Sequence, residues 1–315
     1  MTKIPPKLKA GDVVSLVTTA RFVSRKDVAA AIAMLQGWGL RVLEPAHLYD
    51  VREERRCAIS QFGNDDPARA AMLQEALDNP AVKAIFCCRG GYGTVRMVDL
   101  VDWSSFVRQP KWIVGYSDVT VLHSHIARQF GIATMHAIMP INVPPDTVAG
   151  TRHPAIETCR KALFEESLSY ALDADCLRAG AAEGVIVGGN LSVLYSLMGS
   201  VSEVETDGKI LFIEDVDEYL YHIDRMMQCL RRAGKLKRLA GLLVGQFTDM
   251  HDNGVPFGMD VRDIVADAVK GYAYPVVLGC PFGHIGVDNM ALPLGANVNM
   301  RAVEEGRTAL TLAWR

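Results

Sequence analysis

The chain lacks the long apolar runs and the excess of basic residues that mark several classes of protein. No segment approaches the roughly 20 consecutive apolar residues that a helix needs to cross a bilayer. The opening segment, Met1 to Asp12, has no apolar stretch of the secretory type, so we expect no secretory signal. The net charge of -3 argues against nucleic acid or an anionic membrane as the main partner, because both require basic patches.

Cysteine is present, but not at the spacing of a redox or metal motif. None of the seven cysteines falls in a C-x-x-C pair. Cys87 and Cys88 are adjacent on an expected strand, where cysteine behaves as a small core residue. The histidines form no H-E-x-x-H or other ligand spacing. We therefore expect no metal, no cofactor, and a reducing cytoplasm as the location.

The first half of the chain alternates short apolar strands with amphipathic helices. This spacing is typical of a parallel sheet with helices on both faces. The 315 residues, half of them hydrophobic, predict a sizeable core and two domains of ordinary size. The expected strands are 13–18, 40–43, 82–88, 112–114 and 132–136.

The pattern weakens after residue 142 and returns near 184. Within that stretch only 154–164 has the periodicity of a helix. We predict a first domain over 1–150, a connecting segment over 151–183, and a second, α+β domain over 184–315. Two segments at the end of the chain, 291–300 and 308–314, have no helix between them and are expected to pair antiparallel.

A serine lies at the turn between a buried strand and a helix. Gly115 ends the apolar run Trp112-Ile-Val114, and helical spacing begins at Val119. Ser117 thus occupies the position of a serine-hydrolase nucleophile, although Val119 replaces the second glycine of G-x-S-x-G. Asp118 is placed to cap the new helix, and Ser-Asp at a helix start is also the pattern of an ordinary cap. The motif alone leaves both interpretations open.

Gly90, Gly91 and Gly93 also lie between a strand and a helix. Such a turn gathers backbone N–H groups that bind an anion. The spacing fits neither G-x-G-x-x-G nor G-x-x-x-x-G-K-[ST], which argues against a dinucleotide or nucleoside triphosphate. Ligands of parallel sheets bind at the carboxyl ends of strands, so we expect this turn and Ser117 to face one crevice.

Other polar side chains fall at the ends of later elements. Glu214 and Asp215 end a strand, so their side chains point to opposite faces and only one reaches a given site. His284 lies between glycines that let the backbone turn sharply and expose the imidazole. His136 ends a strand and is expected to border the cleft. Ser117, the acidic strand end and His284 follow the chain order of α/β-hydrolases.

Six short motifs occur in order along the chain. They are Arg89-Gly-Gly-Tyr-Gly93, Gly115-Tyr-Ser-Asp118, Val187-Gly-Gly-Asn-Leu191, Leu211-Phe-Ile-Glu-Asp215, Phe282-Gly-His284 and Leu292-Pro-Leu-Gly295. Together they resemble the LD-carboxypeptidases, serine peptidase family S66, over nearly the whole chain. The resemblance implies a flavodoxin-like parallel-sheet domain followed by a β-rich α+β domain.

The resemblance also implies a role for each site residue. Ser117 would be the nucleophile, His284 the general base and Glu214 the acid that orients it. The backbone N–H groups of Asp118, Gly90 and Gly91 would form the oxyanion hole. The implied reaction releases D-Ala from the murein tetrapeptide L-Ala-γ-D-Glu-meso-diaminopimelate-D-Ala by cutting an L,D-peptide bond, in the cytoplasm, during peptidoglycan recycling. The implied assembly is a homodimer.

The exact substrate stays open at this point. His136-Ala-Ile-Met-Pro140 departs from the His-Gly-Pro that many family members carry. A second branch of the family resembles the microcin C immunity peptidases, which hydrolyse peptidyl or aminoacyl adenylate-like toxins. Val187-Gly-Gly-Asn-Leu191 and the chain length favour the recycling branch. A non-catalytic two-lobed binding protein is the alternative from another class, and it gives Ser117, Glu214 and His284 no reason to converge.

Overall fold

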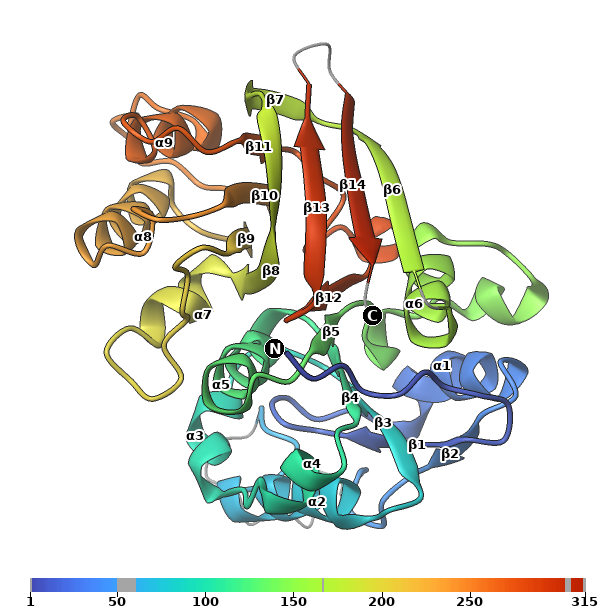
Figure 1. Ribbon diagram of the computed structural model, residues 1–315. Coiled ribbons are helices and arrows are strands. Elements are labelled where there is room, and N and C mark those ends of the chain that lie inside the picture. The colour runs from blue at the N-terminus through green and yellow to red at the C-terminus, as the bar shows by residue number, and fades with distance from the viewer. Residues whose placement is uncertain (1, 50–60, 166, 304–306, 314–315) are drawn as a thin grey trace.

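The computed structural model describes residues 2–49, 61–165, 167–303 and 307–313. Two β-sheets organise these residues into two lobes, stacked one above the other in Figure 1. The first lobe, drawn from blue to green, carries the six-stranded sheet, and the second carries the eight-stranded sheet. No helix in the described part of the chain has the length and apolarity to cross a bilayer.

Five parallel strands form most of the first sheet. They are β1 (Val13–Val17), β2 (Arg41–Leu43), β3 (Val82–Cys87), β4 (Trp112–Gly115) and β5 (Thr134–His136). Their spatial order is β2-β1-β3-β4-β5, which is the flavodoxin-like order. Helices α1 and α5 lie against this sheet in Figure 1. The predicted flavodoxin-like first half is therefore confirmed.

The helices of the first lobe connect successive strands. They are α1 (Arg25–Gly37), α2 (Asp66–Asp78), α3 (Thr94–Met97), α4 (Ser104–Arg108) and α5 (Thr120–Phe130), with the 3₁₀ turns η2 (Val98–Leu100), η3 (Ser117–Val119), η4 (Pro140–Asn142) and η5 (Pro145–Ala149). In α1 a capping box between Ser24 and Asp27 satisfies the first N–H groups. One face of α1, formed by Val28, Ile32 and Leu35, is buried.

The second sheet has the order β6-β14-β13-β8-β9-β10-β11-β7. Its strands are β6 (Ser167–Asp173), β7 (Asp175–Arg178), β8 (Gly180–Asn190), β9 (Ile210–Val216), β10 (Gly241–Thr248), β11 (Val276–Leu278), β13 (Asn297–Ala302) and β14 (Arg307–Ala313). The strands β8 to β11 are parallel and the other pairs antiparallel. The helices α7 (Leu191–Ser196), α8 (Leu220–Arg232) and α9 (Val261–Ala268) follow β8, β9 and β10.

The segment expected to connect the halves contributes to the second sheet. Beyond the predicted helix, α6 (Pro154–Phe164), it forms β6 and β7, which the sequence analysis did not expect. These two strands are the opposite edges of the sheet, yet only Ala174 separates them in the chain. The sheet must therefore curl until its edges meet, and Figure 1 shows β6 bending over into β7. Leu168, Tyr170 and Leu172 are the buried residues of β6, and their recurrence at every second position was a strand signal in the sequence.

The predicted strand 291–300 is two strands in two different sheets. β12 (Leu292–Leu294) pairs antiparallel with β5 and forms the edge of the first sheet. β13 pairs antiparallel with β14, as expected for the last two segments. Gly295 makes the switch with φ +88°, and a Cβ there would lie 2.9 Å from Ala133 Cα. Only glycine fits this crossing.

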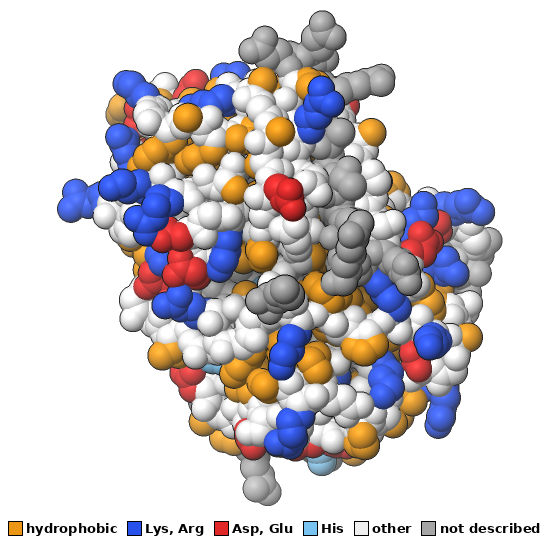
Figure 2. Space-filling model, viewed as in Figure 1, with side chains coloured by type: hydrophobic (Ala, Val, Ile, Leu, Met, Phe, Trp, Pro, Cys, Tyr) orange, Lys and Arg blue, Asp and Glu red, His pale blue; other side chains and the backbone are white. Residues whose placement is uncertain are grey.

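A second glycine contact joins the lobes next to the serine turn. A Cβ on Gly189 would lie 2.5 Å from Thr120 Oγ1, so the end of β8 lies directly against the start of α5. The N–H of Asn190 donates to Thr120 Oγ1 at 3.0 Å. On the face drawn in Figure 2, basic and acidic side chains are interspersed over both lobes, in keeping with the small net charge.

Candidate active site

Ser117 lies on a strained turn at the carboxyl end of β4. Its φ is +64°, a left-handed conformation that costs a residue with a Cβ atom about 1–2 kcal/mol. Tyr116 before it is extended, and Ser117 begins the turn η3, which leads into α5. The predicted strand-turn-helix is thus present. The strain is typical of a nucleophile elbow, which aims a serine side chain away from the sheet.

A buried histidine forms a hydrogen bond with the backbone just before this turn. His123 Nε2 lies 2.9 Å from the carbonyl oxygen of Gly115, and its Nδ1 lies 2.8 Å from Thr134 Oγ1. Burial lowers the pKa of His123 to about 4, so the ring is neutral and its N–H donates to the carbonyl. His125, two residues further along α5, turns away from Gly115, and its Nδ1 lies 2.9 Å from Ser202 Oγ. No pattern in the sequence indicated the contact between His123 and Gly115.

The Gly90-Gly91 turn lies beside the serine. A Cβ on Gly90 would lie 3.0 Å from Ser117 Cβ and 3.1 Å from its Oγ. Within the described ranges, the N–H groups of Gly90, Gly91 and Asp118 donate to no acceptor. The turn after β3 and the turn after β4 therefore present free backbone donors around one serine, an arrangement that suits a developing oxyanion.

The predicted cap by Asp118 is wrong. Among the described residues no side chain caps η3 or α5, and Asp118 Oδ2 instead accepts a hydrogen bond of 2.9 Å from the N–H of Thr94. Thr94 begins α3, directly after the glycine turn. Burial raises the pKa of Asp118, and its hydrogen bonds to Thr94 oppose that rise. Asp118 thus ties the glycine turn to the serine turn.

Glu214 and His284 form a hydrogen-bonded pair on the second lobe. Glu214 Oε2 lies 2.7 Å from His284 Nδ1. The carboxylate is wholly buried, and 17 % of the His284 side chain is exposed. A Cβ on Gly283 would lie 2.8 Å from Glu214 Oε2, so glycine permits this approach. Because a carboxylate accepts from Nδ1–H, Nε2 is left as the acceptor.

The pair changes the basicity of the imidazole. Burial alone lowers the pKa of His284, but the hydrogen bond to Glu214 and the charges of Glu214 and Asp215 raise it by more. The net pKa lies above the ordinary value. Asp215, on the opposite face of β9, accepts from Asn190 Nδ2 and from the N–H of Ser192, both at 2.8 Å. As predicted for neighbours on a strand, the two carboxylates serve different faces.

The two lobes meet at Tyr116 and His284. Their ring centroids are 4.9 Å apart in an edge-to-face arrangement, so the imidazole lies against the residue that precedes Ser117. No hydrogen bond joins Ser117 and His284 in the described part of the chain. Such contacts are often long before substrate binds. Tyr116 was not among the residues expected at the site, and its hydroxyl lies 3.2 Å from Asn142 Oδ1.

His136 does not border the cleft. Its ring is fully buried between Tyr116 and Phe212, with centroid distances of 5.7 and 5.0 Å. Burial, followed by the nearby histidines His123 and His284, lowers its pKa well below the usual range. His136 is therefore a neutral core residue under Tyr116, and the departure at Ala137 to Met139 also falls on buried positions.

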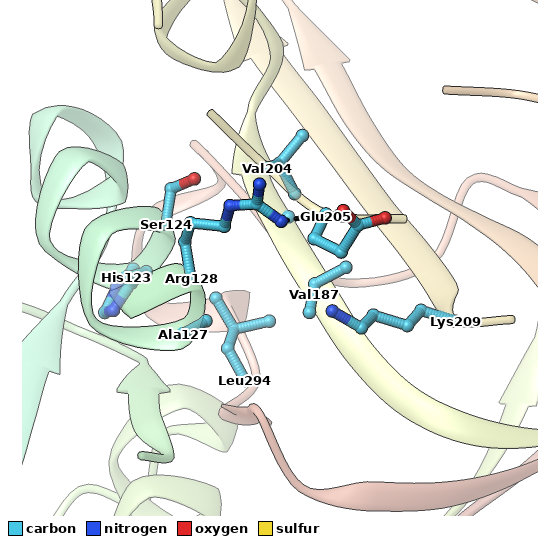
Figure 3. Close-up of a pocket in the computed structure, with 10 residues that line it drawn as sticks. His123, Ser124, Ala127, Arg128, Val187, Val204, Glu205, Lys209 and Leu294 are labelled. Atoms are coloured by element: carbon cyan, nitrogen blue, oxygen red, sulfur yellow. Dashed lines mark hydrogen bonds and ion pairs between the residues drawn. The ribbon is translucent and has the colours of Figure 1, made fainter. Parts of the chain in front are cut away.

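A separate hollow lies between α5 and β8, and Figure 3 shows it. Arg128 and Glu205 form an ion pair of 2.7 Å across it, and Lys209 extends from the far side. None of its lining residues is Ser117, Glu214 or His284. It is a gap at the junction of the lobes and not the candidate active site. No three His, Cys, Asp or Glu side chains of the described residues gather in a metal-binding cluster.

Comparison with known proteins identifies the family. Residues 14–137 match the LD-carboxypeptidase N-terminal domain, and residues 183–300 match the LD-carboxypeptidase C-terminal domain. A relative from Bacillus subtilis (strain 168), "Probable murein peptide carboxypeptidase", is 34 % identical over 96 % of this chain and 92 % of its own.

Two solved structures share the fold. The muramoyltetrapeptide carboxypeptidase from Oxalobacter formigenes is 25 % identical, covers 96 % of this chain and 98 % of its own, and has a TM-score of 0.83. An MccF-like protein from Bacillus anthracis str. Ames is 20 % identical, covers 99 % of both chains, and also has a TM-score of 0.83. With both domain matches in order, and a relative 34 % identical along almost the whole length, the chain belongs to the LD-carboxypeptidases, peptidase family S66.

Proposed function

We propose that this protein is a serine carboxypeptidase that releases D-Ala from the murein tetrapeptide by hydrolysing the bond between meso-diaminopimelate and D-Ala. The observation that carries the proposal is the buried Glu214–His284 pair, packed against the turn that bears Ser117. The B. subtilis and O. formigenes relatives carry names for activity on murein peptides, which supports this substrate class. The homodimer and the cytoplasmic location stay predictions.

The proposed reaction proceeds through an acyl-enzyme. Ser117 Oγ attacks the scissile carbonyl carbon while His284 Nε2 takes its proton, and Glu214 stabilises the resulting imidazolium. The free N–H groups of Gly90, Gly91 and Asp118 bind the oxyanion. The C–N bond then breaks, and His284 returns the proton to the amine of D-Ala. Water, activated by the same imidazole, hydrolyses the ester and frees Ser117.

The rigid setting of Ser117 predicts stereochemical selectivity. Attacking oxygen and oxyanion donors are fixed on backbone, so the acyl-side centre decides whether its carbonyl reaches both. Inverting that centre misplaces the carbonyl, and a shift of about 1 Å can cost on the order of a hundredfold in rate. A tetrapeptide ending in meso-diaminopimelate-D-Ala should therefore be cleaved, and a pentapeptide ending in D-Ala-D-Ala poorly.

Mass spectrometry of the two digests tests the proposal. Release of D-Ala from the tetrapeptide alone is the expected result, and equal or faster cleavage of the pentapeptide overturns the L,D assignment. An aminoacyl-sulfamoyl adenosine serves as a third substrate. Faster turnover of that compound would favour the toxin-hydrolysing branch, which the proposed residues would serve equally well.

A further inference from the structure

A cation lies beside the glycine turn that borders Ser117. Arg21 follows β1, and its stem runs along Gly91, where a Cβ would lie 2.5 Å from Arg21 Nε and 2.6 Å from Cδ. Gly91 has φ +108°. A side chain at position 91 would therefore be strained and would displace the arginine. The turn and Arg21 form one surface at the carboxyl ends of β1 and β3.

This arginine meets no acceptor among the residues that the structure describes. Its Nε atom is buried and meets no hydrogen-bond partner within the ranges that the structure describes, and the guanidinium joins no ion pair there. Its neighbours differ, because Arg69 and Arg96 both pair with Asp66. A buried donor on a charged group is costly when unpaired. With no partner among the described residues, the guanidinium is available to an anion supplied from outside the chain.

The position of Arg21 relative to Ser117 indicates which carboxylate of the substrate it would bind. Gly90 lies against Ser117 Oγ, and the next residue, Gly91, lies against Arg21. Arg21 is therefore separated from the attacking oxygen by this glycine turn. In a peptide cut at Ser117, only the amide nitrogen and an α-carbon separate the scissile carbonyl carbon from the terminal carboxyl carbon. That keeps the two carbons within about 4 Å. The other carboxylates of the tetrapeptide lie further along its chain.

We propose that Arg21 binds the free C-terminal carboxylate of the substrate and thereby makes the enzyme a carboxypeptidase. The planar guanidinium fork matches a carboxylate, and the charge strengthens each hydrogen bond. This inference rests on the proposed function and deepens it. It assigns a specificity-determining residue on the first lobe, next to the catalytic machinery but outside the proposed triad.

The test compares two substrates and two arginine variants. The tetrapeptide ending in D-Ala is assayed against the same peptide ending in D-alaninamide, which lacks the terminal charge. The wild-type protein should prefer the carboxylate by about ten- to hundredfold in kcat/KM. Arg21→Met keeps the stem and should abolish the preference by slowing only the carboxylate substrate. Arg21→Lys keeps the charge and should restore part of it.

The control removes an arginine that already has a partner. Arg96→Met deletes a cation near the same turn and should leave the preference unchanged. Equilibrium binding of the tetrapeptide to Ser117→Ala, with and without Arg21→Met, should show the same loss without turnover. A third peptide has Lys in place of diaminopimelate and so lacks the side-chain carboxylate of that residue. It tests whether Arg21 binds that carboxylate instead of the C-terminal one.

Each outcome bears on a different statement. If Arg21→Met keeps the wild-type preference for the carboxylate over the amide, Arg21 does not bind it. If the variant instead loses a preference for diaminopimelate over Lys, the arginine binds the wrong carboxylate for our proposal. If the wild-type protein releases no D-Ala from the tetrapeptide, the proposed function fails and this inference fails with it.

Discussion

At the scale of single residues, the conformation of Ser117 is the most informative feature. A left-handed serine at φ +64° is unfavourable, and a protein retains such strain where the geometry has a use. We expect Ser117→Ala to lower the rate by several powers of ten, as loss of the nucleophile does in serine hydrolases. Activity above about a tenth of the wild-type level would remove Ser117 from the mechanism.

A glycine at the same position separates catalysis from strain. Ser117→Gly should be as inactive as Ser117→Ala but more stable, by about 1 kcal/mol in the free energy of unfolding, because glycine has no Cβ to clash at positive φ. Urea denaturation of the two variants measures the difference. Equal stability would show that the turn is not strained in solution.

The His284–Glu214 pair makes activity depend on pH. In the proposed mechanism His284 must be neutral to accept the serine proton. Because its pKa is raised, the rate should rise with pH, with a midpoint above the ordinary histidine value of about 6.5. Glu214→Gln removes the charge that raises the pKa of His284 against the effect of burial. The midpoint of the pH profile should therefore fall, and the rate should drop by about a hundredfold or more. Asp215→Asn, whose charge is a smaller cause, should move the midpoint less. A pH–rate profile of kcat/KM for each variant decides between the two acids.

The contribution of His284 to the free energy of unfolding should fall as pH rises, whereas the catalytic rate rises. A histidine whose folded pKa is raised stabilises the fold fully below its unfolded value of about 6.5 and loses that contribution as pH rises through the folded pKa. The contribution of the pair to the free energy of unfolding and the catalytic rate should therefore change in opposite directions over the same pH window.

At the scale of elements, the site is a junction of turns that follow different strands. Asp118, in the turn after β4, accepts from the N–H that begins α3, and this bond sets the distance between the two groups of oxyanion donors. The alignment of the proposed oxyanion hole thus depends on one buried carboxylate.

Removing the Asp118 side chain should lower catalysis more than replacing it with the isosteric asparagine does. Asp118→Ala leaves the Thr94 N–H unsatisfied, at a cost of about 1–3 kcal/mol in unfolding free energy, and should lower kcat by about ten- to hundredfold through misaligned donors. Asp118→Asn keeps an acceptor oxygen and should retain most of the activity. A wild-type kcat in Asp118→Ala would show that the turns are held apart by other contacts.

At the scale of the whole molecule, a strand from the C-terminal part of the chain links the two lobes. β12 comes from the last part of the chain but lies in the first sheet, beside β5. Three of the four tryptophans, Trp38, Trp103 and Trp112, belong to the first lobe. Their fluorescence and the far-UV circular dichroism of both lobes should therefore report one unfolding transition with one midpoint.

Two glycines test the role of the crossing. Gly295→Ala places a Cβ 2.9 Å from Ala133 Cα, whereas Gly199→Ala has open space at a similar φ of +81°. Both variants should lose about 1 kcal/mol from left-handed strain, and Gly295→Ala should lose more, in both spectroscopic signals together. Equal losses, or separate midpoints, would mean that β12 does not couple the lobes.

Local chemistry in the sequence was enough to predict the elements around the site. The apolar run Trp112–Gly115 and the helical spacing after Val119 specify a buried strand and a helix without reference to the rest of the chain. Opposite faces for Glu214 and Asp215 likewise follow from the period of a strand. The order of five parallel strands came from the family resemblance, and the structure agrees with it.

Pairings between distant segments were decided only by the tertiary structure. The edge position of β12, the closure of the second sheet through Ala174 and the bond from Thr94 to Asp118 all join groups whose separation along the chain gives no periodic signal. The 2.7 Å contact between Glu214 and His284, which are 70 residues apart, has no periodic signal either, and only the family resemblance had implied it. Residue spacing determines which face a side chain occupies, whereas its partner depends on which surfaces pack together once the chain has closed its long loops.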